Sequence, residues 1–344
     1  MKARTLHAMT IAGIVALAST FVSAESDRAA TTPADGHKTW TAPRTPDGQP
    51  DLQGYWNSQT YTPFERPAEL KDKAFFTPEE AEAYARRRQS QFENQSADDI
   101  HYDNAIWQSE KTKKRASLRT SLVVDPPDGR VPPLIAEAQQ RQDAQAAARR
   151  ANAPHAYDSV QNRPLAERCI VWPHEGPPMQ PVGYNSNLSF VQGPGYVVVI
   201  QEMIHNARVI PLVDRPHVGA ALREYYGDSR GHWEGDTLVV ETTNFTDKTQ
   251  FRGSTSSLKV TERFTRTDPD TIVYRATMED PHTWARPWTI EYTMNKTNDP
   301  VFEYACHEGN YGMQNILRAQ RQAERKTSEQ KPAPARSGET GTNQ

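Results

Sequence analysis

One stretch decides the fold class of this chain: residues 195–245, GYVVVIQEMIHNARVIPLVDRPHVGAALREYYGDSRGHWEGDTLVVETTNF. It begins and ends with runs of Val, Ile, Leu and Thr, which are typical of β-strands. Between these runs, ionisable side chains stand beside apolar ones. Such an arrangement is costly unless the charges pair, bind a ligand or react. The stretch therefore predicts strands and, between them, the functional site.

Further strand patterns surround this stretch, and turn residues separate them. They are SNLSFVQ (186–192), SLKVTERFTR (257–266), TIVYRATME (271–279) and RPWTIEYTMNK (286–296). The alternation of residue types and the spacing of the turns predict an antiparallel meander. Six or more strands favour a closed barrel, because closure removes exposed edges. A curved open sheet or a sandwich is the alternative.

Helix patterns flank the β-rich region. Thr77-Pro78-Glu79-Glu80 forms a capping box and predicts a helix to about residue 94. The Ala-, Gln- and Arg-rich residues 133–152 predict a surface helix, and a third is expected near the C-terminus. The organisation we expect is a signal peptide (1–24), a flexible linker (25–45), an N-terminal strand with helical decoration (46–164), a β-barrel domain with a closing helix (165–326) and a disordered tail (327–344).

The first 24 residues have the pattern of a secretory signal peptide. Lys2 and Arg4 precede an apolar run over 9–21, and Val22-Ser23-Ala24 supplies the small residues needed for cleavage after Ala24. No later stretch has the roughly 20 apolar residues of a transmembrane helix. We therefore expect a periplasmic or secreted protein without a membrane span.

The cysteines and the net charge also bear on location and partners. Cys169 and Cys306 are the two cysteines, and an oxidising compartment favours a disulfide between them. Two buried free thiols are the alternative. The formal charge is −3, and loss of the signal peptide makes it more negative. A weakly acidic protein has no general attraction to nucleic acid or anionic lipid.

Several stretches resemble a family of exported bacterial proteins whose activity is uncharacterised. They are PRTPDGQPDLQGYW, ERC (167–169), QEMIHNARVIPL, GDSRGHWEGDTLVVETTNF, ERFTR and EYACHEGNYGM. This resemblance implies no particular activity, substrate or cofactor. Separately, Gly54-Tyr55-Trp56 is similar to the Gly-x-Trp that opens the first strand of lipocalins. That resemblance implies an eight-stranded, lipocalin-like barrel around an apolar ligand cavity.

Five side chains are candidate catalytic groups, because His, Glu and Arg at strand ends supply acids, bases and charge stabilisation. The strand through QEMIHNAR becomes polar midway, which suits the mouth of a barrel. A second His–Glu pair follows Cys306. The candidates are His205, Glu202, Arg208, His307 and Glu308. The alternatives are a histidine hydrogen-bonded within the core and polar groups that cap a helix.

Three further motifs supply candidate ligand-binding residues. GDSRGHWEGD can hold a bidentate Asp–Arg pair, PHTWARPW can line an aromatic cavity, and EYACHEGNY adds an amide and a phenol. The candidates are Asp228, Arg230, Trp233, His282, Trp284, Trp288, Asn310 and Tyr311. The alternatives are a structured turn with ion pairs and ordinary packing of tryptophan.

We expect neither a metal nor a cofactor. The histidines lack His-x-His and HExxH spacing, and the sequence has no Gly-x-Ser-x-Gly and no nucleotide-binding fingerprint. One hypothesis is an enzyme that binds a small apolar or aromatic molecule in a barrel cavity and acts by acid–base chemistry of hydrolase, lyase or isomerase type. The other is a non-catalytic carrier or a structural envelope protein. The sequence does not specify the oligomeric state.

Overall fold

The computed structural model describes residues 40–93 and 118–329. The chain divides into two units, Met1–Trp40 and Thr41–Gln344, and the fold below belongs to the second. The predicted signal peptide, its cleavage site after Ala24 and the predicted linker up to residue 39 lie outside the described residues. So does the predicted tail from residue 330 onward.

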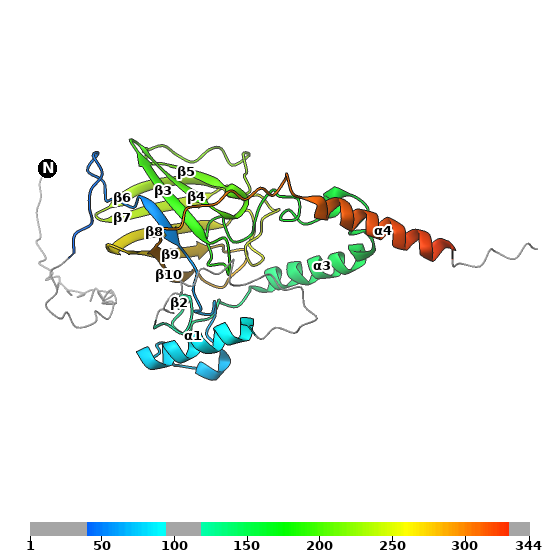
Figure 1. Ribbon diagram of the computed structural model, residues 1–344, viewed down its shortest axis with the longest axis horizontal. Helices are drawn as coiled ribbons and strands as arrows, with labels where there is room; N and C mark the ends of the chain where they lie inside the picture. The colour runs from blue at the N-terminus through cyan, green and yellow to red at the C-terminus, as the bar shows by residue number, and fades with distance from the viewer. Residues whose placement is uncertain (1–39, 94–117, 330–344) are drawn as a thin grey trace, which may run out of the picture. The chain divides into compact units, whose positions relative to one another are not determined.

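The fold is mainly β, as the sequence predicts, and consists of one antiparallel sheet of ten strands (Figure 1). The strands are β1 (Gly54–Asn57), β2 (Val123–Asp125), β3 (Asn187–Gly193), β4 (Tyr196–Gln201), β5 (Ala207–Pro211), β6 (Asp228–Glu234), β7 (Thr237–Thr243), β8 (Lys259–Asp268), β9 (Thr271–Glu279) and β10 (Trp288–Lys296). Their hydrogen-bonded order is β5-β4-β3-β1-β10-β9-β8-β7-β6, and β2 adds to β10. The meander predicted from residue 236 to residue 296 is confirmed as β7 to β10.

Two local predictions are wrong. The charged segment predicted as a loop after Gly227 is strand β6, whose Ser229 and Gly231 point inward and are small enough to do so. The extended chain predicted through QEMIHNAR is interrupted by a short 3-10 turn at Met203–His205, which reverses the chain between β4 and β5. In both places the periodicity of the side chains was too irregular to separate a strand from a turn.

The inner face of the sheet carries one continuous apolar core. Buried and exposed positions alternate along β8 and β9, so that Val260, Phe264, Tyr274 and Met278 all point inward. Each large apolar side chain buried in this way stabilises the fold by about 1.5–3 kcal/mol. The N-terminal strand β1 is an internal strand between β3 and β10, and its Trp56 is fully buried in the same core.

In residues 40–93 and 118–329, three α-helices lie outside the sheet: α1 (Pro78–Glu93), α3 (Ala136–Asn152) and α4 (Tyr311–Glu329). The predicted capping box is confirmed, because Thr77 N donates to Glu80 Oε2 at 2.8 Å and Glu80 N donates to Thr77 Oγ1 at 3.3 Å. Helix α4 continues three residues into the segment predicted as a disordered tail. Within the two described ranges, no helix is both long and apolar enough to cross a membrane.

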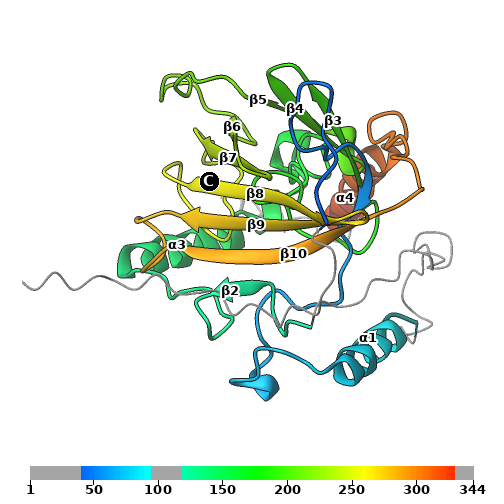
Figure 2. The same cartoon turned by 90° about the vertical axis from the view of Figure 1, so that its left-hand side faces the viewer.

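The predicted closed barrel is not confirmed, because β5 and β6 are the two ends of the hydrogen-bonded order. The sheet nevertheless curves until these two strands lie side by side (Figure 2). Gly231 of β6 permits this approach. A Cβ atom there would lie 2.8 Å from Ile210 Cγ2 and from Leu212 Cδ2, which is closer than packed side chains allow.

Arg208 of β5 crosses from one edge strand to the other. Its Nε donates to Ser229 Oγ of β6 at 3.1 Å, and its Nη2 donates to Thr242 Oγ1 of β7 at 3.0 Å. The same guanidinium forms a two-point ion pair with Glu262 of β8, one contact being Nη1 to Oε1 at 3.1 Å. Glu262 is fully buried. Side chains rather than backbone hydrogen bonds therefore join the two edges of the sheet.

The network continues from Glu262 to the segment before β3. Tyr274 Oη donates to Glu262 Oε1 at 2.9 Å and accepts a hydrogen bond from Met179 N at 2.8 Å. Tyr292 Oη donates to Met179 O at 3.3 Å. Met179 is only 1% exposed. Its backbone is thus held inside the sheet, and we call residues 169–180 the plug segment.

Removing one partner of this buried pair should be costly. In the variant Arg208→Met the Glu262 carboxylate loses its counter-charge, and we expect a loss of about 3–5 kcal/mol in the free energy of unfolding. The double variant Arg208→Met/Glu262→Met should lose less than the single one, because no charge is left buried alone. Urea denaturation of the oxidised protein measures both values.

The matched control for this pair is Arg286→Ala. Arg286 contacts Asp125 at 2.8 Å, but both side chains are about half exposed. We expect a cost of under about 1 kcal/mol there. If Arg208→Met costs no more than Arg286→Ala, the buried pair does not hold the sheet together.

Candidate functional site

The candidate catalytic residues from the sequence do not gather at one place. Arg208 is committed to the buried network described above. Glu202 is buried at the end of β4, where its Oε1 accepts a hydrogen bond from Asn185 Nδ2 at 2.6 Å, and burial raises its pKa. Ile204, beside it, has φ +55°, a strained value for a β-branched residue. The side chain of His205 lies outside the described part of the structure, so its role stays a prediction.

The predicted disulfide between Cys169 and Cys306 is confirmed, with 5.8 Å between the two Cα atoms. His307 and Glu308, which follow it, are exposed to solvent. Asn310 instead turns toward the disulfide, since its Nδ2 donates to Glu167 O at 2.9 Å and its Oδ1 accepts from Met313 N at 3.2 Å. The last bond caps helix α4, which is the structural alternative that the sequence left open.

The aromatic candidates pack rather than line a cavity. Trp284 and Trp288 are 3% and 0% exposed, and their rings meet edge to face with centroids 5.4 Å apart. Trp233 packs against the same core from a partly buried position. His282 and Tyr311 are exposed. The two tryptophans therefore contribute to the core in the way that such pairs usually do.

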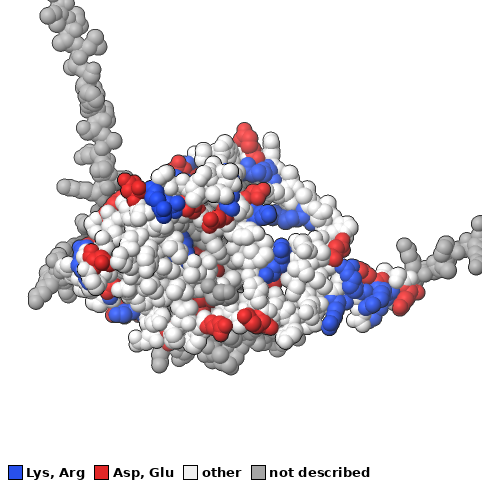
Figure 3. All heavy atoms as spheres, turned by 90° about the horizontal axis from the view of Figure 1, so that it is seen from above, with Lys and Arg blue, Asp and Glu red and all other residues white. Residues whose placement is uncertain are grey.

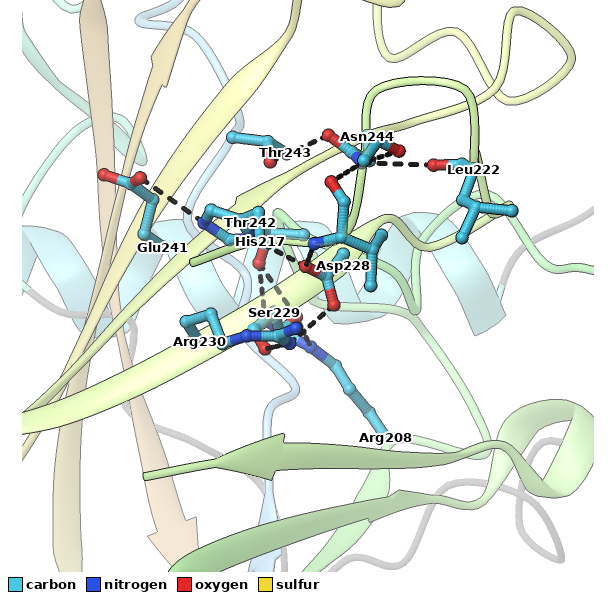
Figure 4. A network of polar contacts seen from close by, with 12 residues as sticks. Arg208, His217, Leu222, Asp228, Ser229, Arg230, Glu241, Thr242, Thr243 and Asn244 are labelled. Atoms are coloured by element: carbon cyan, nitrogen blue, oxygen red, sulfur yellow. Dashed lines mark hydrogen bonds and ion pairs between the residues drawn. The ribbon is translucent and has the colours of Figure 1, made fainter. Parts of the chain in front are cut away.

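Asp228 is the centre of a polar cluster at the start of β6 (Figure 4). Its Oδ2 accepts from Val218 N at 3.0 Å and contacts His217 Nδ1 at 2.8 Å, and its Oδ1 contacts Arg230 Nη1. Arg230 uses that same nitrogen on Ser229 O, so the predicted bidentate fork is not formed. Burial tends to raise the pKa of Asp228, but the hydrogen bonds and the Arg230 charge together lower it.

This cluster fastens the loop 217–227 to the sheet. Asn244, at the end of β7, donates through Nδ2 to the carbonyl oxygens of Val218, Gly219 and Leu222 (Figure 4). Asn244 adopts φ +60°, a conformation that asparagine tolerates better than most residues. Asp228 and Asn244 therefore act as positioning residues for the loop that carries Tyr226.

Tyr226 meets the plug segment and forms the site that we consider functional. Its Oη accepts a hydrogen bond from Trp172 N at 3.3 Å and donates to Glu175 Oε2 at 3.3 Å. Its ring lies against Gly176, where a Cβ atom would come within 2.2 Å of Tyr226 Cδ1. The fit of ring to backbone requires glycine at that position, because no other residue leaves the space.

Three buried polar atoms of the plug segment have no hydrogen-bond partner within the described residues. They are Trp172 Nε1, His174 Nδ1 and Glu175 Oε1, which belong to four consecutive positions of the chain. Buried polar groups are nearly always paired, since an unpaired one costs about 1–3 kcal/mol. Three such atoms within four positions make the plug segment the candidate site.

Burial changes the acidity of these groups. It raises the pKa of Glu175 to about 8, although the hydrogen bond from Tyr226 acts in the opposite direction. Burial and the neighbouring Glu175 raise the pKa of Tyr226 as well. For His174, burial lowers the pKa. All three groups are therefore held in their neutral forms near neutral pH, so that Glu175 carries a proton that it can donate.

A pocket of about 630 Å³ adjoins this group on the side of Tyr226. Its size falls within the range that small ligands occupy in proteins. It is lined by Ile170, Arg223, Glu224, Tyr225, Tyr226, Thr246 and Lys248. We call it the Tyr226 pocket. Glu175 is not part of this lining, but its Oε2 is hydrogen-bonded to Tyr226, which is.

The sequence analysis did not identify Glu175, His174 or Tyr226. One signal was available, because the triplet His-Glu-Gly occurs twice, at 174–176 and at 307–309, and each copy lies a few residues after a cysteine of the disulfide. Glu175 of the first copy is buried, with His174 and Gly176 partly exposed, whereas all three residues of the second copy are exposed.

No cluster of three or more His, Cys, Asp or Glu side chains in the described ranges is arranged to hold a metal ion. On the face shown in Figure 3, basic and acidic side chains are interspersed.

The raised pKa of Glu175 predicts a specific dependence of stability on pH. The folded protein binds this proton more tightly than the unfolded chain, whose Glu pKa is near 4.5. The contribution is therefore full below pH 4.5 and is lost as the pH rises to about 8. Within that window, we expect the unfolding free energy to fall by up to about 1.4 kcal/mol per pH unit on this account.

Urea denaturation of the wild type and of Glu175→Gln at several pH values measures the contribution of Glu175 to the free energy of unfolding. The difference between the two proteins cancels every other titrating group. We expect the advantage of the wild type to shrink as the pH rises and to level off above about pH 8. Parallel stability curves for the two proteins across this range would contradict the assignment.

Comparison of the chain with protein-family models, with curated proteins and with solved structures gave no match in any of the three. The resemblance to a family of exported bacterial proteins thus rests on the motifs alone.

Proposed function

We propose that this protein is an extracytoplasmic acid–base enzyme that binds a small organic molecule in the Tyr226 pocket. The observation that carries the proposal is the buried Glu175 carboxyl group, which is hydrogen-bonded to Tyr226, a residue of the pocket lining, and has one unpaired oxygen. A neutral carboxylic acid held in a dry site is a typical general acid. Its position supports hydrolase, lyase or isomerase chemistry without a cofactor.

The proton transfer that we propose has two linked parts. Tyr226 gives its phenolic proton to a basic oxygen or nitrogen of the bound molecule, and Glu175 gives its own proton to the Tyr226 oxygen in return. Tyr226 thus ends unchanged, Glu175 becomes a carboxylate, and the bound molecule gains one proton. Glu175 then recovers a proton from the product or from water. The two oxygens are 3.3 Å apart; when Tyr226 turns its proton from Glu175 to the bound molecule, the protonated Glu175 becomes the donor of this contact.

The location of the site differs from the barrel cavity that the sequence suggested. The inward positions of the sheet are occupied by the apolar core and by the Arg208 network. A lipocalin-like barrel remains our proposal for the architecture, with the Gly231 contact between β5 and β6 as its support. In this proposal the plug segment fills the end of the barrel, and the ligand binds on its outer side.

Export through the N-terminal signal and membership of the exported family complete the proposal. The disulfide indicates an oxidising compartment outside the cytoplasm. The competing function is a carrier that holds the same molecule without changing it. The two functions differ in the role of the Glu175 proton. An enzyme transfers this proton to the bound molecule, whereas a carrier does not.

Solvent proton exchange tests the proposal even while the substrate is unidentified. The purified protein is incubated in D₂O with the small-molecule fraction of its host cells, and masses are compared with and without protein. We expect one or more compounds to gain deuterium or to change mass with the wild type. Glu175→Gln and Tyr226→Phe should each slow that change by about 100-fold or more.

The control variant is Glu279→Gln, at an exposed position at the end of β9. It should behave as the wild type does. If Glu175→Gln matches the wild type, the acid–base role is wrong. If a compound is retained by all variants and is never altered, the protein is a carrier.

A further inference from the structure

A second pocket, of about 1000 Å³, lies between helix α3 and the segment 247–253. One face of the helix lines it, because the contributing residues are spaced three or four apart. These are Gln142, Gln145, Arg149 and Asn152, and the facing segment contributes Asp247, Lys248, Gln250 and Arg252. We call this pocket the α3 cleft.

The α3 cleft has an excess of positive charge. Arg149, Lys248 and Arg252 line it, with Asp247 as the acidic residue among its lining side chains. In the described part of the chain, neither Arg149 nor Lys248 has an ion-pair partner, although the chain as a whole is acidic. Unpaired cations at a pocket are suited to bind a carboxylate or phosphate group through charge-assisted hydrogen bonds.

Side-chain amides form much of the remaining polar lining. Within the described ranges, Gln145, Asn152 and Gln250 have no hydrogen-bond partner for their carboxamides. A carboxamide both donates and accepts, as a hydroxyl group does, so the three can pair with several hydroxyl groups of a ligand. None of the described side chains that line the cleft is Phe, Tyr or Trp. The lining therefore matches a hydroxylated anion better than an apolar or aromatic molecule.

Lys248 lines both the α3 cleft and the Tyr226 pocket. The two pockets are therefore neighbours, and one extended ligand can reach from the first into the second. Such a ligand would place its charged, hydroxylated part against α3 and a reacting group beside Tyr226.

We propose that the α3 cleft binds a hydroxylated organic anion of oligomeric size, of which an acidic oligosaccharide is the chemical class. Arg149 and Lys248 hold carboxylate groups, and Gln145, Asn152 and Gln250 hold hydroxyl groups. The inference names the substrate class of the Tyr226 pocket and in that respect rests on the proposed function. Binding itself requires no proton transfer.

Isothermal titration calorimetry of the disulfide-bonded protein tests the inference with three probes: galacturonate trimer, the neutral galactose trimer and inorganic phosphate. We expect the acidic trimer to bind, the neutral trimer to bind at least about tenfold more weakly, and phosphate not to displace the acidic trimer at equal concentration. Higher salt should weaken binding of the acidic trimer.

Variants locate the binding. Lys248→Ala and Arg149→Ala should each weaken binding of the acidic trimer by about tenfold. Arg150→Ala is the matched control, because it removes the same charge from the next position of α3 and does not line the cleft. Glu175→Gln should bind as the wild type does, which separates binding in the cleft from the acid–base role.

Several results would overturn the inference. They are no binding of the acidic trimer, equal binding of the neutral trimer, displacement by phosphate, or an equal loss in Arg150→Ala. If Glu175→Gln leaves both binding and deuterium exchange unchanged, the acid–base function is contradicted, whereas the binding of the acidic trimer in the α3 cleft is not.

Discussion

Burial of the Arg208–Glu262 ion pair takes two charges out of water, at a cost of several kcal/mol for each ion. Hydrogen bonds from neighbouring side chains offset this cost. Ser229 and Thr242 accept hydrogen bonds from Arg208, and Tyr274 donates one to Glu262. Arg208 joins the edge strands β5 and β6, which share no backbone ladder, and through Glu262 and Tyr274 the network reaches Met179. One network thus connects both edges of the sheet to the plug segment.

The site depends on that position. The plug segment brings Glu175 into an environment with little water, and the loop 217–227 brings Tyr226 to meet it. Asp228 and Asn244 hold this loop from the sheet, and the disulfide ties the start of the plug segment to the chain before α4. Both halves of the site are therefore tied to the sheet or to the disulfide, which supports the defined geometry that acid–base chemistry needs. Asp228, in the charged motif of β6, contacts the loop at His217 and Val218.

Local patterns were enough to predict the strands from 236 to 296, the capping box at Thr77, the disulfide and the mainly β class. These features depend on alternation, on short-range hydrogen bonds and on cysteine count. The pairing of Arg208 with Glu262 and the contact of Glu175 with Tyr226 were not predictable, since both join residues more than fifty positions apart. Charges in a motif point to an important place in the chain, but only the packing decides whether they hold the fold or face a ligand.

The most direct test of the account is a carbon-13 NMR titration of the protein labelled at its glutamate carboxyl groups. The account predicts one carboxyl group that is still protonated at neutral pH and titrates near pH 8, and whose signal is missing from Glu175→Gln. That result would establish a proton donor behind Tyr226. If all glutamate carboxyl groups titrate near their ordinary pKa, or if the late signal remains in Glu175→Gln, the assignment of this site is contradicted.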